Sequence, residues 1–153
     1  MIETPLPRIL LVEDNPTNRL VICAMLRDHA EIEIAENGED GLEKLSAGDY
    51  DGALVDIRMP VMDGETMMAR WREVEAERGA VRMPAAACTS NVQPAEIRRI
   101  HAAGFDRHLE KPVMIPVLRE VVEWIAVRSQ GAAAARALAA AAATSGRTDG
   151  AAA

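Results

Sequence analysis

Five short apolar runs alternate with helix-like segments along this chain of 153 residues, and the alternation limits its possible folds more than any other feature. Regular strand–helix alternation is typical of a parallel sheet with helices on both faces. Strands in such a sheet are buried on both sides, which fits apolar runs that continue almost without a break. We expect the strands at residues 8–14, 31–35, 51–56, 84–90 and 105–111.

The segments between these runs space their apolar residues three and four apart, as amphipathic helices do. In the first segment we expect Leu20, Val21, Ala24 and Met25 to share the buried face. The sequence therefore predicts a doubly wound, five-stranded α/β domain, with residues 31–35 as an edge strand. The expected helices span residues 17–29, 37–50, 65–78, 94–103 and 115–128.

Composition changes near residue 130, where an alanine-rich stretch of low complexity begins. Alanine favours helix, so this stretch can extend the last helix, but it has little apolar pattern with which to dock. We predict an N-terminal lead at residues 1–7, one folded domain at 8–129, and a flexible or partly helical tail at 130–153.

The overall charge and the cysteines argue against nucleic-acid binding and against a metal or redox site built on cysteine. A formal net charge of −7 argues against broad binding to a nucleic-acid backbone, which needs a basic surface. Cys23 and Cys88 lack the spacing of a metal or redox motif, so we expect reduced, buried thiols. We find neither a secretory signal pattern nor an apolar run long enough to cross a bilayer, and we expect a cytoplasmic protein.

Acidic residues follow two of the expected strands. Glu13 and Asp14 end the first apolar run, and Asp56 ends the third. Right-handed crossovers bring the carboxyl ends of parallel strands to one edge, so we expect the three carboxylates to converge. Like charges at close range are unfavourable unless a cation joins them, and oxygen ligands are those that Mg²⁺ prefers. The sequence therefore predicts a magnesium site.

A hydroxyl and an ammonium are expected at the same edge, from Thr89 after the fourth strand and Lys111 after the fifth. Together with a cation they suit the binding of a phosphoryl group, and a carboxylate such as Asp56 can act as its nucleophile. A single acid after a strand is usually a turn or cap residue, and we interpret Asp63 in that way.

The stretches LLVEDN, LVDIRMPVMDG, CTSN and EKP resemble the four signatures of the response-regulator receiver domain of the CheY-like superfamily, in the right order. The resemblance covers about residues 7–128 and implies strand order 2-1-3-4-5. It implies that Asp56 is the phosphoacceptor, and that Lys111, followed by a typically cis Pro112, binds the phosphoryl group. It also implies that Thr89 is the switch hydroxyl. The implied Mg²⁺ ligands are Asp14, Glu13 through water, Asp56, and the backbone carbonyl of Arg58.

Further roles follow from the same resemblance. The backbone amide of Ser90 would contact the phosphoryl group, and Arg58 and Asn91 occupy the variable positions that tune its loss. The family often has an aromatic residue that turns inward three positions before the lysine, where this chain has His108. Two interpretations of His108 are open: an imidazole that turns in the same way, and a residue that simply lies at the surface.

We therefore expect a receiver that takes a phosphoryl group from a histidine kinase or a histidine phosphotransfer protein. We expect output through protein contacts on the fourth helix, fifth strand and fifth helix, without a DNA-binding domain, a membrane partner or metabolite turnover. The EDNPTNR opening resembles receivers attached to or served by hybrid kinases, but the start at Met1 and the tail favour a stand-alone regulator.

Two other functional classes fit the sequence less well. A binding module that works without phosphate is the alternative, and the intact set of Glu13, Asp14, Asp56, Thr89 and Lys111 argues against it. A flavodoxin-like electron carrier would need a hydroxyl- and glycine-rich phosphate loop after the first strand. Residues 13–18 read EDNPTN there instead.

Overall fold

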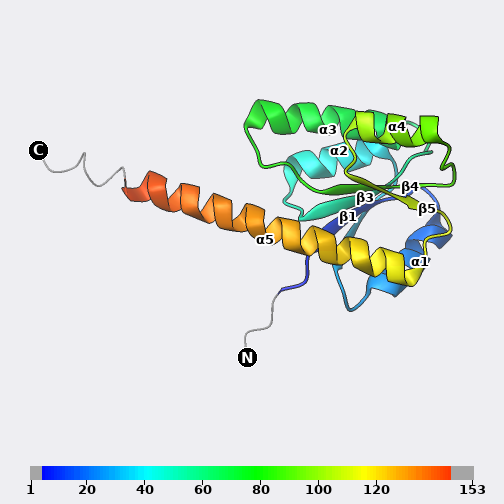
Figure 1. The fold of residues 1–153 in the computed structure, drawn as a ribbon, viewed down its shortest axis with the longest axis horizontal. Coiled ribbons are helices and arrows are strands. Elements are labelled where there is room, and N and C mark those ends of the chain that lie inside the picture. The colour runs from blue at the N-terminus through cyan, green and yellow to red at the C-terminus, as the bar shows by residue number, and fades with distance from the viewer. Residues whose placement is uncertain (1–4, 146–153) are drawn as a thin grey trace, which may run out of the picture.

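The computed structural model describes residues 5–145 and shows five strands alternating with five helices (Figure 1). Each expected element forms, with ends that differ by a few residues from those expected. The elements are β1 (Arg8–Val12), α1 (Pro16–Leu26), β2 (Glu31–Ala35), α2 (Gly38–Ala47), β3 (Gly52–Asp56), α3 (Gly64–Arg78), β4 (Ala85–Thr89), α4 (Pro94–Ala103), β5 (Arg107–Glu110) and α5 (Ile115–Ser145).

All strand pairs are parallel, and the sheet order is β2-β1-β3-β4-β5. This confirms the doubly wound fold and the expected order. Strand β2 is at the edge, as predicted, and β1 lies directly beside β3. The carboxyl ends of β1 and β3 therefore meet, which is the condition for bringing their acids together.

Helices cover both faces of the sheet (Figure 1). On one face, α2, α3 and α4 enclose a core that contains Leu45, Met67, Met68 and Ile100. On the other face, α1 and α5 pack on a second core, which includes Leu26. The apolar residues of α5 that are spaced three and four apart are buried against this core: Leu118, Val121, Val122 and Ile125.

The predicted buried face of α1 is wrong for three of its four residues: Leu20, Val21 and Ala24 are exposed, and Met25 is partly buried against the core. Leu20 is 73% exposed and Val21 is 45% exposed, whereas Ile22 and Leu26 are buried. Apolar residues surround this helix almost completely, so their spacing cannot decide which stripe meets the sheet. The pair that is four residues apart, Ile22 and Leu26, takes that place, and the apolar Leu20 and Val21 are left at the surface.

Helix α5 continues without a break through Ser145 and extends well beyond the sheet (Figure 1). The high helix propensity of alanine accounts for this extension into the alanine-rich stretch. The domain boundary at residue 129 stays a prediction, and residues 146–153 of the predicted tail lie outside the described residues. No helix in the described part is both long and apolar enough to cross a membrane.

A close contact at Gly64 fixes the start of α3 against the end of β3. The Gly64 N–H donates to the Ile57 carbonyl at 2.9 Å. A Cβ atom at Gly64 would lie 2.4 Å from the backbone oxygen of Asp56, which is closer than real contacts allow. Glycine therefore lets α3 support the backbone that carries Asp56.

We expect Gly64→Ala to destabilise the fold by about 1–3 kcal/mol, since the strand end or the helix start must shift. Denaturant unfolding followed by circular dichroism measures the change. The matched control is Gly131→Ala in α5, where an added Cβ meets nothing within 4 Å. This control should be no less stable than the parent, and equal losses in both variants would contradict the assigned role of Gly64.

Candidate functional site

Asp56 is the last residue of the fully buried strand β3 and is itself 7% exposed. It pairs in register with Cys88 of β4, and its strand lies between β1 and β4. Because the strands on both sides cover the backbone, the Asp56 side chain is held at the carboxyl edge of the sheet. This confirms the prediction that Asp56 lies at the end of the third strand.

The three predicted acids converge. Glu13, Asp14 and Asp56 each offer a carboxylate oxygen, and these oxygens all lie within 4.8 Å of one another. Glu13 is buried at 1% exposure, and Asp14 is the most open of the three. The oxygen donors and their spacing fit a hard divalent cation such as Mg²⁺, with Asp14 on the side that solvent reaches.

The turn into α1 orients the acid pair. Asn15 caps the helix by accepting from the N–H groups of Thr17 and Asn18, and its own N–H donates to Glu13 Oε1 at 3.2 Å. The Arg19 guanidinium donates to the backbone carbonyls of Glu13 and Asp14. The start of the helix therefore holds the end of β1 in place.

Lys111 brings a positive charge to the cluster from the end of β5. Its Nζ lies 3.0 Å from Asp56 Oδ1 and 3.5 Å from Glu13 Oε2. The Lys111 N–H donates to the Thr89 carbonyl at 2.9 Å, and the Lys111–Pro112 bond is cis, as the resemblance implied. With all three acids ionised, one ammonium leaves two negative charges uncompensated, and these favour a bound cation.

The close charges shift the pKa values of the cluster. Burial, and then the charge of Asp56, raise the pKa of Glu13 against the opposing effect of Lys111. Burial acts to lower the pKa of Lys111, but the hydrogen bond and charge of Asp56 outweigh it, so this pKa is raised. Because Glu13 must be ionised to hold a cation, acidification through its raised pKa should weaken Mg²⁺ binding.

Thr89 lies at the same edge, one residue beyond the register partner of Asp56. It is buried, and its Oγ1 accepts from the Asn91 N–H at 3.1 Å and lies 3.3 Å from the Asn91 carbonyl, to which it donates. Ser90 and Arg58 are exposed, in the loops that follow β4 and β3. Because these loops follow the carboxyl ends of β4 and β3, both residues lie at the same edge of the sheet as Asp56.

His108 is exposed on β5, and its ring contacts His101 of α4. The ring therefore lies at the surface in this structure, and an inward turn of the imidazole stays untested.

Asp63 is confirmed as a helix cap, since its side chain accepts from Thr66 N–H at 2.8 Å. Cys23 and Cys88 are both free thiols; Cys88 is buried as expected, whereas Cys23 is only half-buried. Burial raises the pKa of Cys88 to about 12.

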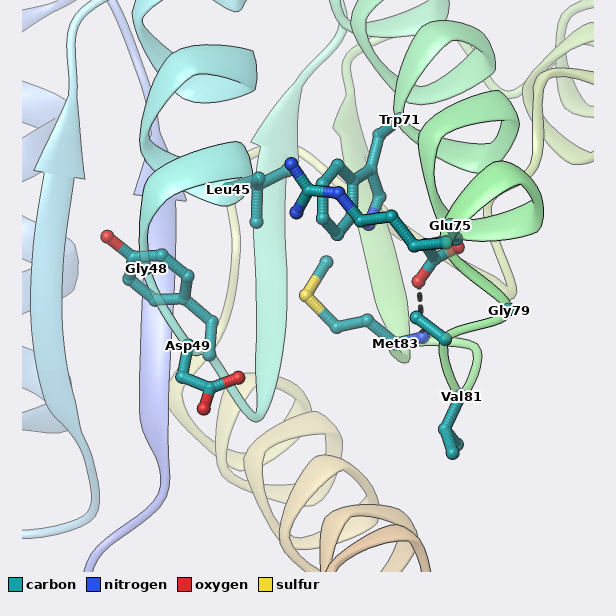
Figure 2. A pocket seen from close by; sticks show the side chains of 11 residues that line it. Leu45, Gly48, Asp49, Trp71, Glu75, Gly79, Val81 and Met83 are labelled. Carbon is teal, nitrogen blue, oxygen red and sulfur yellow. Dashed lines mark hydrogen bonds between the residues drawn. The ribbon is translucent and has the colours of Figure 1, made fainter. Parts of the chain in front are cut away.

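A separate cavity of about 360 Å³ lies near the opposite edge of the sheet, before β3 and β4 (Figure 2). Trp71 and Met83 line it, and the buried Glu75 carboxylate accepts from Met83 N–H at 2.7 Å. None of the predicted site residues lines this cavity. It is therefore distinct from the acid cluster.

Sequence reasoning missed Asn18, Arg19 and His101. Asn18 lies 3.4 Å from Glu13 Oε1, and Arg19 holds the backbone of the acid pair. The NPTNR stretch carried a signal for the first two, because Asn followed by Pro is typical of a helix start. The contact of His101 with His108 joins a helix end to a strand, and no spacing rule predicts it.

Comparison with known proteins gives consistent matches. The family model of the response regulator receiver domain matches residues 9–123. The sensor histidine kinase GacS of Pseudomonas protegens is 35% identical over 129 residues, covering 82% of this chain. The chain spans only 14% of the length of that kinase.

Solved structures match over most of the chain. The receiver domain of sensor histidine kinase PA1611 from Pseudomonas aeruginosa PAO1, with magnesium in its active-site cleft, has a TM-score of 0.71 at 33% identity, covering 80% of this chain and 99% of that one. The co-crystal structure of the Saccharomyces cerevisiae phosphotransfer protein Ypd1 with the receiver domain of Ssk1 holds a chain with a TM-score of 0.77. That match is 24% identical and covers 82% of this chain and 92% of that one, and it shows the fold alone.

We expect two substitutions to move the pKa of Glu13 in opposite directions in metal-free protein. Asp56→Asn removes a negative charge and lowers this pKa, whereas Lys111→Gln removes a positive charge and raises it. Carboxyl-detected NMR titration in the presence of a chelator measures both shifts. The exposed acid Glu123 on α5 supplies the control Glu123→Gln, which should leave the pKa unchanged, and shifts of the same sign in the first two variants would contradict the assigned coupling.

Proposed function

We propose that this chain, which belongs to the response regulator receiver domain family, accepts a phosphoryl group on Asp56 from a phosphohistidine of a partner protein. The observation that carries the proposal is the contact of the Asp56 carboxylate with the Lys111 ammonium inside a cluster of three acids. The donor would be a sensor histidine kinase or a histidine phosphotransfer protein. Receiver domains are signalling modules and do not turn over a metabolite.

In the proposed transfer, an oxygen of Asp56 forms a bond to phosphorus while the phosphorus–nitrogen bond of the donor breaks. The nitrogen electron pair stays with the donor imidazole, and Asp56 becomes an acyl phosphate. The Lys111 ammonium already contacts this carboxylate before the donor arrives, 3.0 Å from Asp56 Oδ1. Mg²⁺, when bound, neutralises charge on the phosphoryl oxygens.

Four groups of this chain would hold the magnesium ion. Asp14 and Asp56 would bind it directly, the Arg58 carbonyl would add an oxygen, and Glu13 would act through water. Support comes from the convergence of the three carboxylates and from their excess negative charge over Lys111. An ion that takes only oxygen ligands and keeps several waters suits this set.

The proposed switch begins at Thr89. Its hydroxyl now donates to the Asn91 carbonyl, and in the phosphorylated state it would donate to a phosphoryl oxygen instead. Lys111 and the Ser90 amide would contact the same group, with Arg58 and Asn91 setting how readily water reaches it. Release of Asn91 would alter the loop before α4, and the signal would leave through contacts on α4, β5 and α5.

A surface beside the acid cluster suits the donor protein. A cavity of about 470 Å³ is bounded by Glu13 and Lys111 on one side and by Val21 and Met25 of α1 on the other. With Pro112 and Val113, which also line the cavity, Val21 and Met25 form an apolar area next to the proposed phosphorylation site. Apolar areas with a charged rim are typical of protein interaction sites.

The same proposal includes a stand-alone regulator in the cytoplasm, a reducing compartment in which free thiols such as Cys23 persist. GacS instead carries the matching segment within a longer kinase. A binding module that ignores phosphate is the competing function. It gives no reason for three acids and a lysine to meet at one strand edge.

Acetyl phosphate with Mg²⁺ should add one phosphoryl group per chain, and Asp56→Asn should abolish the addition because the amide is not a nucleophile. Intact-mass spectrometry under neutral conditions measures the gain. Asp63→Asn is the matched control, since Asp63 caps α3 in the neighbouring loop. Labelling that persists in Asp56→Asn would overturn the assignment of the phosphoacceptor.

Val21→Asp should slow phosphotransfer from the donor protein by roughly tenfold, equivalent to about 1.4 kcal/mol, because it places a charge in the proposed docking area. Rapid-quench assays with the phosphorylated donor measure this rate, after a screen of candidate kinases identifies the donor. Labelling by acetyl phosphate should stay unchanged, since that small donor needs no docking. Val127→Asp, at an exposed position on α5, is the control. Equal loss with both donors would contradict the docking role.

A further inference from the structure

We propose that His101 and His108 form a binding site for a divalent transition-metal ion, separate from the acid cluster. His101 lies in the last turn of α4, and His108 lies on β5. Their rings meet edge to face, with centroids 5.5 Å apart and planes inclined at 83°. Both residues are exposed, so an ion can reach them from solvent.

The backbone sets the tautomer of His101. Its Nδ1 lies 3.1 Å from the Phe105 carbonyl, and because a carbonyl only accepts, Nδ1 must carry the proton. In the neutral ring Nε2 then has a free electron pair, directed toward His108. Metal-binding histidines usually donate their other N–H to a carbonyl or carboxylate in this way, which orients the ring before the ion arrives.

The two nitrogens that face each other are His101 Nε2 and His108 Nδ1, 3.3 Å apart. Two nitrogens bound to one tetrahedral zinc at about 2.0–2.1 Å are separated by about 3.3–3.4 Å. The pair can therefore take an ion with small ring rotations, once His108 carries its proton on Nε2. Without metal, the His108 Nδ1–H donates to His101 Nε2, which is the simple alternative.

The ligand atoms decide the class of ion. Imidazole nitrogen binds Zn²⁺, Cu²⁺ and Ni²⁺, whereas carboxylate oxygen suits Mg²⁺. The two sites of this chain thus differ in the metals that they select. Water would complete the coordination at the histidine pair, and affinity would be moderate because the protein supplies only two ligands.

His101 shares a surface pocket with three arginines. Arg82 is paired with Asp106, and Arg107 and Arg128 lie over the Trp124 ring. The carboxyl end of a helix carries partial negative charge, and His101 is in that turn of α4. The neighbouring cation on β5, Arg107, has its guanidinium over the Trp124 ring of α5, 4.5 Å from the centroid. Successive strand residues face opposite ways, which directs Arg107 away from His108.

Calorimetric titration of the full chain with ZnCl₂ tests the site, with saturating Mg²⁺ present to occupy the acid cluster. We expect one Zn²⁺ per chain, loss of that binding in His101→Gln and in His108→Gln, and full binding in His29→Gln. His29 is the remaining one of three histidines and serves as the matched control. The same ion should raise the melting temperature of the parent protein, since it links α4 to β5.

Imidazole NMR of the unmodified protein locates the ion without any substitution. Zinc should shift the ring signals of His101 and His108 and leave those of His29 in place. Absence of binding in the parent, or equal binding in all three variants, would overturn the proposal. Zinc-induced shifts confined to His29 would do so as well, and would leave the phosphorylation proposal untouched.

Discussion

The position of Lys111 between Asp56 and Glu13 is the interaction on which the rest of the site depends. Three strands deliver these groups: β1 ends before Glu13, β3 ends with Asp56, and Lys111 follows β5. The ammonium lies within 3.5 Å of both carboxylates and so offsets part of the repulsion between them. Without this contact, the end of β3 would carry a buried acid beside another acid, with no countercharge from the protein.

The packing around β3 explains why that arrangement stays fixed. Every residue of β3 is buried, and Gly64 lets α3 begin directly against the backbone of Asp56. A site built on a central strand and a close helix contact has little freedom to relax when charges change. The Asn91 loop after β4 is freer, because the Thr89 hydroxyl holds it by side-chain hydrogen bonds that a competing acceptor can replace.

Much of this could be predicted from sequence because the signals are local and reinforce one another. The apolar runs predict the five strands, and the acids at the ends of two of them predict that Asp56 and Glu13 belong to the site. The buried face of α1 could not be predicted, since apolar residues lie on nearly all sides of that helix. The His101–His108 contact likewise depends on where α4 ends above β5, which is a tertiary property.

The error on α1 bears directly on function. Val21, which the apolar spacing assigned to the core, instead lines the cavity beside Glu13 and Lys111. Its exposure adds apolar surface beside these two residues, at the rim where we propose that the donor protein binds. In the proposed transfer, an apolar area at that rim would hold the partner while Asp56 receives the phosphoryl group, so recognition and chemistry would use different residues. The same separation would apply to His108, whose ring contacts His101 of α4, so a substitution there should leave the proposed magnesium ligands in place.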